Sequence, residues 1–411
     1  MKPSGIEWIG DIPDDWKVLK YKYAGRFEKG KLPKFINREN KGSPIIGASE
    51  MNGGLPILFT EDSDIPKCRK DDVLFLWDGA NAGLVSSGLD GILSSTVVKY
   101  VCTNNINIKY LFYLTKYYEK YFKSKVNGTT IPHMSYDFIN DCPLLEPPLQ
   151  TQQRIADYLD EKCGEIDATI AKQKESIEKL KAYKQSLISE TVTKGLDKSA
   201  SLKPSGIDYL GDIPSHWEIR KLKYVAKLDP TISEFLRDND IVSFAPMECL
   251  GEQTLSPYET EYGKVKGKYT YFANEDIIMA KVTPCFENGN IAIAKNLKNN
   301  VGFGSSELFV FRAKNISNSF LMYSLYSEPF KSLAKSTMYG TGGLKRVSPN
   351  FILNYKIPLP PLKTQESIAD YLDSKCSQID KYITEKQNII QKLDAYKKSL
   401  IFECVTGKKR I

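Results

Sequence analysis

Apolar residues recur at spacings of three and four along two long stretches of the chain, over residues 155–187 and 368–400. This period is typical of an α-helix with one apolar stripe, and the opposite face of each stretch is rich in Lys, Glu and Gln. Each stretch runs for about six heptads without a proline, which corresponds to a rod of roughly 60 Å at about 1.5 Å per residue. The pattern therefore predicts two long helices, over residues 147–193 and 360–411.

The apolar stripe of each predicted helix is narrow, close to the two positions in seven of a coiled-coil seam. On an isolated helix the apolar side chains of such a stripe would be exposed to water. We therefore expect the two helices to pair with each other, antiparallel, within one chain. The alternative is that each helix packs only on the segment that precedes it. The residues predicted to form the seam are Leu159, Ile166, Ile170, Ile177, Leu180, Leu187, Leu372, Ile379, Ile383, Ile390, Leu393 and Leu400.

The segments that precede the two helices, residues 17–146 and 218–359, follow a different pattern. They contain short apolar runs bounded by Gly, Asn, Asp and Pro, such as residues 72–77 and 276–282. Runs of this length and composition indicate β-strands. Each segment therefore combines strands with other structure in one domain.

Aromatic side chains gather in one helix-like stretch of each segment, over residues 110–122 and 320–333. We interpret these tyrosines and phenylalanines as core residues, since large aromatic rings dominate the packing of protein interiors. The alternative is a face on which nucleobases stack. A helix beside several short strands makes each segment an α+β domain.

Two motifs of the chain appear twice, in the same order. The opening motif, Gly-Asp-Ile-Pro-x-x-Trp, begins at Gly10 and again at Gly211. The helix-head motif, Pro-Pro-Leu-x-Thr-Gln-x-x-Ile-Ala-Asp-Tyr-Leu-Asp, begins at Pro147 and again at Pro360. The two segments between these motifs do not resemble each other in sequence. We call the two repeated motifs, with the long helices, the frame, and the unlike segments between the motifs the inserts. A similar frame around two different inserts indicates one geometry that reads two different targets.

Together these patterns predict an α+β protein with a pseudo-two-fold internal repeat. Two globular α+β domains are separated by two long helices that form an intramolecular antiparallel coiled coil. Along the chain, the predicted segments are a first domain over residues 1–146, a central helix over 147–193, a linker over 194–202, a second domain over 203–359 and a C-terminal helix over 360–411.

The composition of this 411-residue chain narrows the classes of function. Hydrophobic residues make up 41% of it, enough for real cores, and the net charge of +7 mildly favours a polyanionic partner. Eight cysteines form no Cys-x-x-Cys pair and only two histidines accompany them, which favours free thiols in a reducing cytoplasm over zinc sites. No apolar run approaches the roughly 18 residues of a membrane helix, and the N-terminus lacks the apolar core of a signal peptide.

The familiar signatures of catalysis are missing from the sequence. It has no Gly-x4-Gly-Lys-Ser/Thr phosphate loop and no Gly-x-Gly-x-x-Gly turn after a strand. The Asn-Pro-Pro-aromatic tetrad of amino-methyltransferases is also missing, and no His/Cys cluster suggests a metal. We therefore expect a chain without catalytic residues, bound cofactor or metal. The rival interpretation is a DNA methyltransferase or nuclease of unfamiliar pattern.

The opening motif, the helix-head motif and their ordered duplication resemble the specificity (S) subunit of type I restriction-modification enzymes. The second insert also resembles one class of target-recognition domain, through the stretches Asp276–Gly289 and Gly302–Glu307. The first insert resembles the family only in outline, through Trp77–Gly83 and Gly128–Thr130. The resemblance covers essentially the whole chain.

This resemblance implies a non-catalytic subunit in which each insert is a target-recognition domain that reads one half of a split double-stranded DNA sequence. The paired helices would fix the spacer between the half-sites and dock two methyltransferase (modification) subunits, and motor-nuclease (restriction) subunits would complete the complex. S-adenosylmethionine, ATP and Mg would then be bound by the partner subunits, and no membrane would be involved. The alternative is an orphan or regulatory S-like DNA-binding or scaffold protein that does not serve restriction.

DNA binding needs cations for phosphates and amide, guanidinium or hydroxyl groups for base edges, and loops at domain tips are the natural place for them. The candidates in the first insert lie in a basic stretch and two glycine loops: Lys31, Lys34, Arg38, Trp77, Asp78, Asn81, Thr129, Thr130 and His133. The candidates in the second insert are Lys281, Thr283, Asn288, Ser305, Ser306, Thr341, Lys345 and Arg346. The alternative for each is an ordinary solvated or loop-shaping residue.

Overall fold

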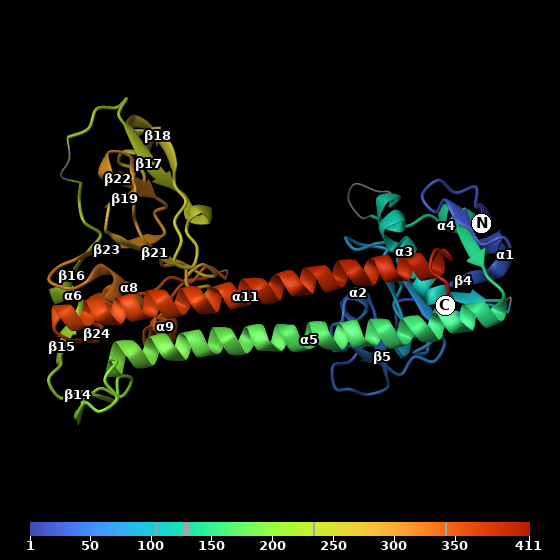
Figure 1. The fold of residues 1–411 in the computed structure, drawn as a ribbon, viewed down its shortest axis with the longest axis horizontal. Coiled ribbons are helices and arrows are strands. Elements are labelled where there is room, and N and C mark those ends of the chain that lie inside the picture. Colours follow the sequence, from blue (N-terminus) through green and yellow to red (C-terminus); the bar gives the residue numbers. More distant parts are fainter. Residues whose placement is uncertain (104, 127–131, 233–234, 342) are drawn as a thin grey trace. The chain divides into compact units, whose positions relative to one another are not determined.

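The computed structural model describes residues 1–103, 105–126, 132–232, 235–341 and 343–411. These residues form two compact units. Unit 1 comprises Met1–Lys174 together with Gln387–Ile411, and unit 2 comprises Glu175–Lys386 (Figure 1). The units differ from the linear segments predicted from the sequence, because each unit takes part of both long helices.

The two predicted long helices are α5, Leu149–Lys194, and α11, Leu362–Val405. Both begin directly after a Pro-Pro pair, two residues later than predicted, since the residue before a proline is biased toward extended backbone. Both end close to a glycine in the left-handed region, Gly195 with a φ of 76° and Gly407 with a φ of 71°. Such a glycine is a common stop signal for a helix.

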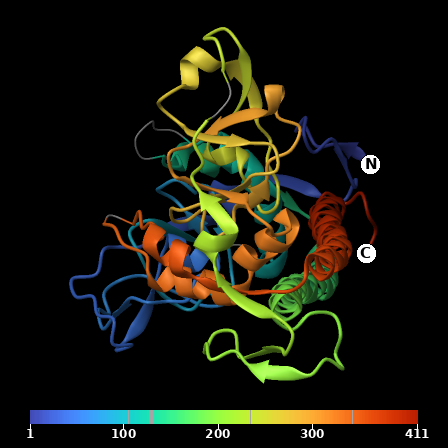
Figure 2. The same cartoon turned by 90° about the vertical axis from the view of Figure 1, so that its left-hand side faces the viewer.

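The two long helices lie side by side (Figure 2). Contacts between the late part of each helix and the early part of the other show that they run antiparallel, as predicted. In unit 1, the ammonium of Lys397 lies 2.6 Å from the Asp167 carboxylate, and in unit 2 the ammonium of Lys184 lies 2.9 Å from the Asp380 carboxylate. The two ion pairs are equivalent in the repeat, because their members are 213 residues apart (397 minus 184, and 380 minus 167). The helices therefore contact each other in both units, which rules out the alternative that each packs only on the segment before it.

The predicted seam is buried unevenly. Its buried members are Leu159, Ile166, Ile170, Ile177, Leu372, Ile379 and Leu400. Its half-buried members are Leu180, Leu187, Ile383, Ile390 and Leu393. Leu159 and Leu372 are both fully buried, because each packs on the core of a domain as well as on the facing helix. The periodicity missed Ile188 and Ile401, which are buried one residue beyond predicted seam positions.

Unit 1 contains two four-stranded sheets and one aromatic helix. The first sheet has the order β4 (Gly25–Lys29), β11 (Val97–Cys102), β8 (Val73–Leu76) and β9 (Val85–Ser86). The second has the order β6 (Phe59–Thr60), β5 (Ser43–Ile46), β10 (Gly91–Leu93) and β7 (Lys67–Cys68). Helix α3, Ile108–Ser124, buries Tyr110, Tyr118 and Phe122, so its aromatic rings are core residues, as predicted.

Unit 2 repeats both sheets strand for strand. The first has the order β16 (Ala226–Leu228), β23 (Leu308–Ala313), β20 (Ile277–Ala280) and β21 (Ile291–Ile293). The second has the order β18 (Tyr258–Glu261), β17 (Ile241–Ala245), β22 (Val301–Gly304) and β19 (Thr270–Ala273). A parallel pair, β5 with β10 in unit 1, is also repeated, by β17 with β22. Inserts that look unlike in sequence therefore share one topology.

The aromatic stretch of unit 2 is divided between two helices, α8 (Asn318–Tyr326) and α9 (Glu328–Ser336). Short elements complete unit 1: β1 (Lys2–Pro3), β2 (Asp11–Ile12), β3 (Lys17–Lys20), α1 (Tyr21–Ala24), α2 (Ala48–Met51), α4 (Tyr136–Asp141) and β12 (Pro143–Glu146). Those of unit 2 are β13 (Leu202–Pro204), β14 (Asp212–Pro214), β15 (Glu218–Lys221), α6 (Leu222–Val225), η1 (Met247–Cys249), α7 (Tyr262–Val265), η2 (Lys298–Asn300), α10 (Pro349–Asn354) and β24 (Lys356–Leu359). The strand pairs β1–β2 and β3–β12 recur as β13–β14 and β15–β24.

The opening motif covers the end of a long helix. Its tryptophans, Trp16 and Trp217, are 3% and 2% exposed. In unit 2, a Cβ added to Gly195 would lie 2.9 Å from the Trp217 indole, and in unit 1 a Cβ added to Gly407 would lie 3.1 Å from the Trp16 indole. The two glycines follow α5 and α11, so each copy of the motif packs on the helix that ends in its own unit.

The helix-head motif attaches the start of each long helix to its domain. Gln152 is 1% exposed and its side chain accepts a 2.9 Å hydrogen bond from the backbone N–H of Asn107, just before α3. Gln365 is 2% exposed and accepts a 2.8 Å bond from the backbone N–H of Ser317, just before α8. A buried amide needs such partners, which explains why both copies keep glutamine here.

The aspartate that ends the helix-head motif makes a second attachment. The Tyr113 hydroxyl of α3 donates a 2.8 Å hydrogen bond to Asp160, and the Tyr323 hydroxyl of α8 donates a 2.6 Å bond to Asp373. The repeated residues of the motif are therefore those that join helix and domain in the same way in both units.

Candidate nucleic-acid interface

In unit 1, loops predicted to touch DNA meet at the end of the β4-β11-β8-β9 sheet. Backbone hydrogen bonds of 3.0 and 2.9 Å join residues 132–134 to residues 77–79, directly after β8. They place Asp78 opposite His133. Lys29, the last residue of β4, forms a 2.9 Å ion pair with Asp78. This contact brings the basic stretch to the same place as the glycine loops.

Unit 2 has the equivalent meeting of loops. Two backbone hydrogen bonds of 2.9 Å join residues 345–347 to residues 281–283, directly after β20. They place Val282 opposite Arg346. The Arg346 guanidinium donates two 2.8 Å hydrogen bonds to Glu307, in the β22–β23 loop. Three loops named from the sequence are thereby connected.

The two meeting places have one backbone arrangement and unrelated side chains. The bridge between Asp78 and His133 in unit 1 corresponds to the bridge between Val282 and Arg346 in unit 2. Each follows the strand at the same position of the same sheet. A loop held by backbone bonds keeps its shape when its side chains change, which is what a surface that reads sequence requires.

Trp77 lies under the surface of this interface. Its side chain is 3% exposed, and its ring centroid lies 4.1 Å from that of Tyr136. The indole also lies 6.0 Å from Phe27. The glycine loop starts one residue later than the sequence suggested, because Trp77 is still part of the core. We therefore leave Trp77 out of the proposed contacts to DNA.

Two predicted residues of unit 2, Thr283 and Ser305, hold loops in place, and a third, Lys281, packs on an aromatic ring. The Thr283 hydroxyl donates a 2.8 Å hydrogen bond to the Gly343 carbonyl and accepts a 2.9 Å bond from the backbone N–H of Lys345. Ser305 accepts a 3.2 Å bond from the backbone N–H of Glu307. The Lys281 ammonium lies 5.4 Å from the centre of the Phe309 ring. Thr283 and Ser305 position the loops that carry other candidates.

Lys345 and Arg346 differ in whether their charge is paired with a carboxylate. Within the described part of the chain, the Lys345 ammonium forms no ion pair. The Arg346 guanidinium is paired with Glu307, and its hydrogen bonds hold the pKa of the Glu307 carboxyl below its usual range. Lys345 is therefore the freer cation of the two. Arg346 offers DNA a charge that is already partly neutralised.

The other predicted residues present exposed side chains. They are Lys31, Lys34, Arg38, Asn81, His133, Asn288, Ser306 and Thr341. Thr129 and Thr130 lie outside the described residues. Exposed amides, hydroxyls and cations at the ends of sheet strands are suited to contact a groove and its phosphates.

Sequence reasoning missed one residue type in this region. Phe35 is 80% exposed in the β4–β5 loop of unit 1, and Phe235 is 91% exposed in the equivalent β16–β17 loop of unit 2. Each is followed in the sequence by an exposed arginine, Arg38 three residues after Phe35 and Arg237 two residues after Phe235. The sequence carried no clear signal for them, because phenylalanine is most often buried and nothing in the pattern marks these two as exposed.

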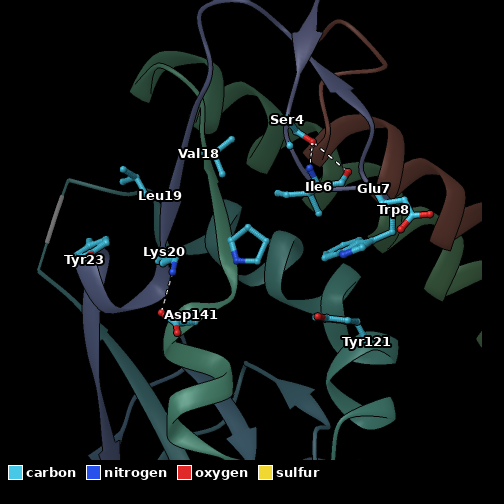
Figure 3. A pocket seen from close by; sticks show the side chains of 12 residues that line it. Ser4, Ile6, Glu7, Trp8, Val18, Leu19, Lys20, Tyr23, Tyr121 and Asp141 are labelled. Atoms are coloured by element: carbon cyan, nitrogen blue, oxygen red, sulfur yellow. Dashed lines mark hydrogen bonds and ion pairs between the residues drawn. The ribbon is translucent and has the colours of Figure 1, made fainter.

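A groove of about 770 Å³ opens elsewhere in unit 1 (Figure 3). Residues 4–8, which precede the opening motif, line it together with β3 and the start of β12, with Trp8 and Tyr121 on one side and the exposed ion pair of Lys20 and Asp141 on the other. None of the predicted DNA-contacting residues lines it.

The described residues contain no group of three or more His, Cys, Asp or Glu side chains that is arranged to hold a metal ion. Among the helices in those same ranges, none combines the length and the apolar character that crossing a membrane requires.

A family model described as "Type I restriction modification DNA specificity domain" matches residues 13–181 and 214–395. The chain belongs to this family. The two matches cover the two halves of the internal repeat, each with one recognition domain and most of one long helix. The chain is thus a DNA specificity subunit of a type I restriction-modification system, and such subunits are the non-catalytic members of their complexes.

Curated relatives agree with the family match. The chain is 30% identical over 424 residues to the type I restriction enzyme MjaVIII specificity subunit of Methanocaldococcus jannaschii, with 97% of this chain and 94% of that protein covered. It is 37% identical over 193 residues to the type I restriction enzyme EcoAI specificity subunit of Escherichia coli, with 45% of this chain and 32% of that protein covered.

A solved structure described as "Structural basis underlying complex assembly and conformational transition of the type I R-M system" has the same fold. It aligns with a TM-score of 0.69 and 17% identity, and the alignment covers 97% of this chain and all of that chain. The predicted α+β fold with two β-rich domains and two packed long helices is confirmed.

Proposed function

We propose that the two units read the two unlike halves of a split DNA sequence, one unit for each half. The observation that carries this proposal is the shared backbone arrangement of the two candidate interfaces. It places Asp78 opposite His133 in unit 1 but Val282 opposite Arg346 in unit 2, and of these four side chains only that of Val282 is buried. Because base edges are distinguished by the side chains on a fixed backbone, equal backbones with unequal side chains favour two different half-sites.

The exposed candidates divide by chemistry into two roles. Lys31, Lys34, Arg38 and Lys345 are exposed cations and contact phosphates, which positions the duplex without reading it. Amide and hydroxyl side chains contact base edges in the grooves. These readers are Asn81, Asn288, Ser306 and Thr341.

The paired helices α5 and α11 fix the spacer between the half-sites. Two features support this role: each helix is continuous over more than 40 residues, and two equivalent interhelical ion pairs oppose sliding of one helix along the other. Bases opposite a rigid spacer go unread, so the site is bipartite.

The helix pair also docks two copies of the methyltransferase subunit, and restriction subunits join that core. S-adenosylmethionine, ATP and Mg are bound by those partners. The M. jannaschii relative, a specificity subunit of a type I restriction enzyme, supports an assembly of this kind. The duplicated frame supports two copies of one partner, because equivalent surfaces bind equivalent subunits.

Methylation profiling of host DNA tests this proposal. The chain is expressed with the methyltransferase subunit of the same system in a host without other modification enzymes, and methylated positions are read genome-wide. The expected result is one motif with two unlike defined halves and an unread spacer of constant length. A single continuous motif, or no sequence preference despite a stable complex, would contradict the proposal.

A further inference from the structure

Besides the helix-head motif, a ten-residue stretch of the long helices is closely repeated, residues 179–188 in α5 and 392–401 in α11. Eight of the ten positions are identical. In the fourteen positions before it, residues 165–178 and 378–391, only four are identical. Those four are three seam isoleucines and the aspartate of the interhelical ion pair, Ile166, Asp167, Ile170 and Ile177 in the first copy.

Packing accounts for only part of the identity in the ten-residue stretch. The repeated leucines and isoleucines face the seam or a domain core, and the repeated lysine makes the interhelical ion pair. Four identical positions remain, and their side chains are exposed in both copies: Lys179, Ala182, Tyr183 and Ser186, and Lys392, Ala395, Tyr396 and Ser399. We call these two sets the tyrosine faces.

Each tyrosine face is a continuous patch of one helix. Positions 179, 182, 183 and 186 have the spacing i, i+3, i+4 and i+7, which places them on one side of α5, and the second set has the same spacing on α11. The rings of Tyr183 and Tyr396 are 58% and 55% exposed. Exposed residues elsewhere in the preceding stretch changed between the copies, so identity at these positions has a cause outside the chain's own packing.

We propose that each tyrosine face is the docking site of one methyltransferase subunit, with Tyr183 and Tyr396 as the anchors. This inference takes its partner from the proposed function and adds the surface. Tyrosine is enriched among anchors of protein interfaces, because a large ring with a polar tip fills a partner pocket at low entropic cost. The adjacent Ala182 and Ala395 let a partner approach the helix backbone closely, and the lysines lie at the rim.

The duplication decides between occupants. A partner present once would need only one of the faces, whereas two identical faces suit two copies of the same protein. DNA is a poor occupant, because each face offers one lysine and phosphate binding uses several cations. The unlike loops of the two units are placed to read DNA, and the identical faces are placed to bind a common partner.

The test measures how many methyltransferase subunits bind the full-length chain. Native mass spectrometry and light scattering are applied to the wild type, Tyr183→Ala, Tyr396→Ala and the double variant, each mixed with excess methyltransferase subunit. We expect two bound copies for the wild type, one for either single variant and none for the double variant. The affinity of the lost copy should fall at least about tenfold.

Tyr382→Ala is the matched control. Tyr382 is 55% exposed on the same helix as Tyr396, but its counterpart in α5 is Thr169, so it belongs to no repeated face. It should keep two copies bound. Loss of a copy from Tyr382→Ala, or two copies retained by the double variant, would overturn the assignment. A wild-type chain that binds no methyltransferase subunit would overturn the proposed function, and one that occupies these faces by forming its own dimer would overturn the choice of partner.

Discussion

Units 1 and 2 have the same two sheets, the same helix attachments and the same backbone bridges at their candidate interfaces, yet their inserts look unlike in sequence. The difference is concentrated where loops meet after β8 and β20. There an Asp–His bridge in one unit is replaced by a Val–Arg bridge in the other. Topology is therefore determined by apolar pattern and frame contacts, and loop side chains are free to diverge.

The two interhelical ion pairs also differ between the units, in how deeply the lysine is buried and in how many carboxylates it contacts. In unit 1, the side chain of Lys397 is 27% exposed and, among the residues that the structure describes, pairs with Asp167 alone. In unit 2, the side chain of Lys184 is 7% exposed and pairs with both Asp380 and Glu252. The extra carboxylate comes from the second insert. Lys184 and Lys397 are therefore equivalent in the repeat but stabilise the fold to different extents.

Ile170→Asp and Ile383→Asp should show the largest contrast between the units. Ile170 is 7% exposed in the core of unit 1, and Ile383 is half-buried in unit 2. Placing a carboxylate in an apolar site costs more when water cannot reach it, so we expect Ile170→Asp to lower the free energy of unfolding by about 3 kcal/mol and Ile383→Asp by about 1 kcal/mol. Urea unfolding followed by circular dichroism measures both. Equal losses would mean that the seam is uniform.

Lys184→Met and Lys397→Met sharpen the comparison of the ion pairs. Removing the buried Lys184 ammonium leaves two carboxylates without their partner, and we expect a loss of about 2 kcal/mol. Removing the more exposed Lys397 should cost about 0.5 kcal/mol. Thermal unfolding at low ionic strength compares the variants. A larger loss of stability for Lys397→Met than for Lys184→Met would contradict this ranking of the two ion pairs.

Lowering the pH should weaken the contacts that Glu252 makes with Lys184 and Tyr326 in unit 2. Burial alone would raise the pKa of Glu252, but its hydrogen bonds to Tyr326 and Lys184 lower it overall. A carboxyl whose pKa is depressed on folding contributes stability above its unfolded pKa, about 4.3, and loses it as the pH falls through the folded value. The stability advantage of the wild type over Glu252→Gln should therefore shrink below about pH 4. An advantage that stays constant across this window would contradict the ionic role of Glu252.

Lys345→Ala should have a small effect that is specific to DNA. Removing one phosphate contact should weaken binding to a duplex about threefold and reduce the slope of log affinity against log salt by about 0.9. Arg346→Ala should also lower the melting temperature, because it breaks the pair with Glu307. Lys381→Ala, an exposed lysine on α11, is the control and should leave affinity and slope unchanged. An unchanged slope for Lys345→Ala would remove it from the interface.

Much of this structure could be predicted from the sequence because its signals are periodic or duplicated. The long helices, their antiparallel pairing and the strands at 73–76 and 277–280 follow from apolar spacing. Periodicity could not reveal that Ile188 and Ile401 turn toward domain cores, since that depends on contacts between distant segments.

The candidate interface was less accessible to prediction. The glycine loops were found, but the sequence does not say which residues after a buried strand have left the core, and Trp77 had not. Nor does it show that Thr283 would be engaged by Gly343, or Arg346 by Glu307, because such pairs depend on how loops from separate parts of the chain meet. Phe35 and Phe235 became notable only through their exposure.

We propose that one frame presents two different readers. This is tested by a chain in which residues 218–359 are replaced by a second copy of residues 17–146, so that both frames carry the first insert. Methylation profiling of this chain with its methyltransferase subunit should give a symmetric motif, with the first half-site repeated in opposite orientation. A folded chain that still methylates the original unlike half-sites would contradict the account.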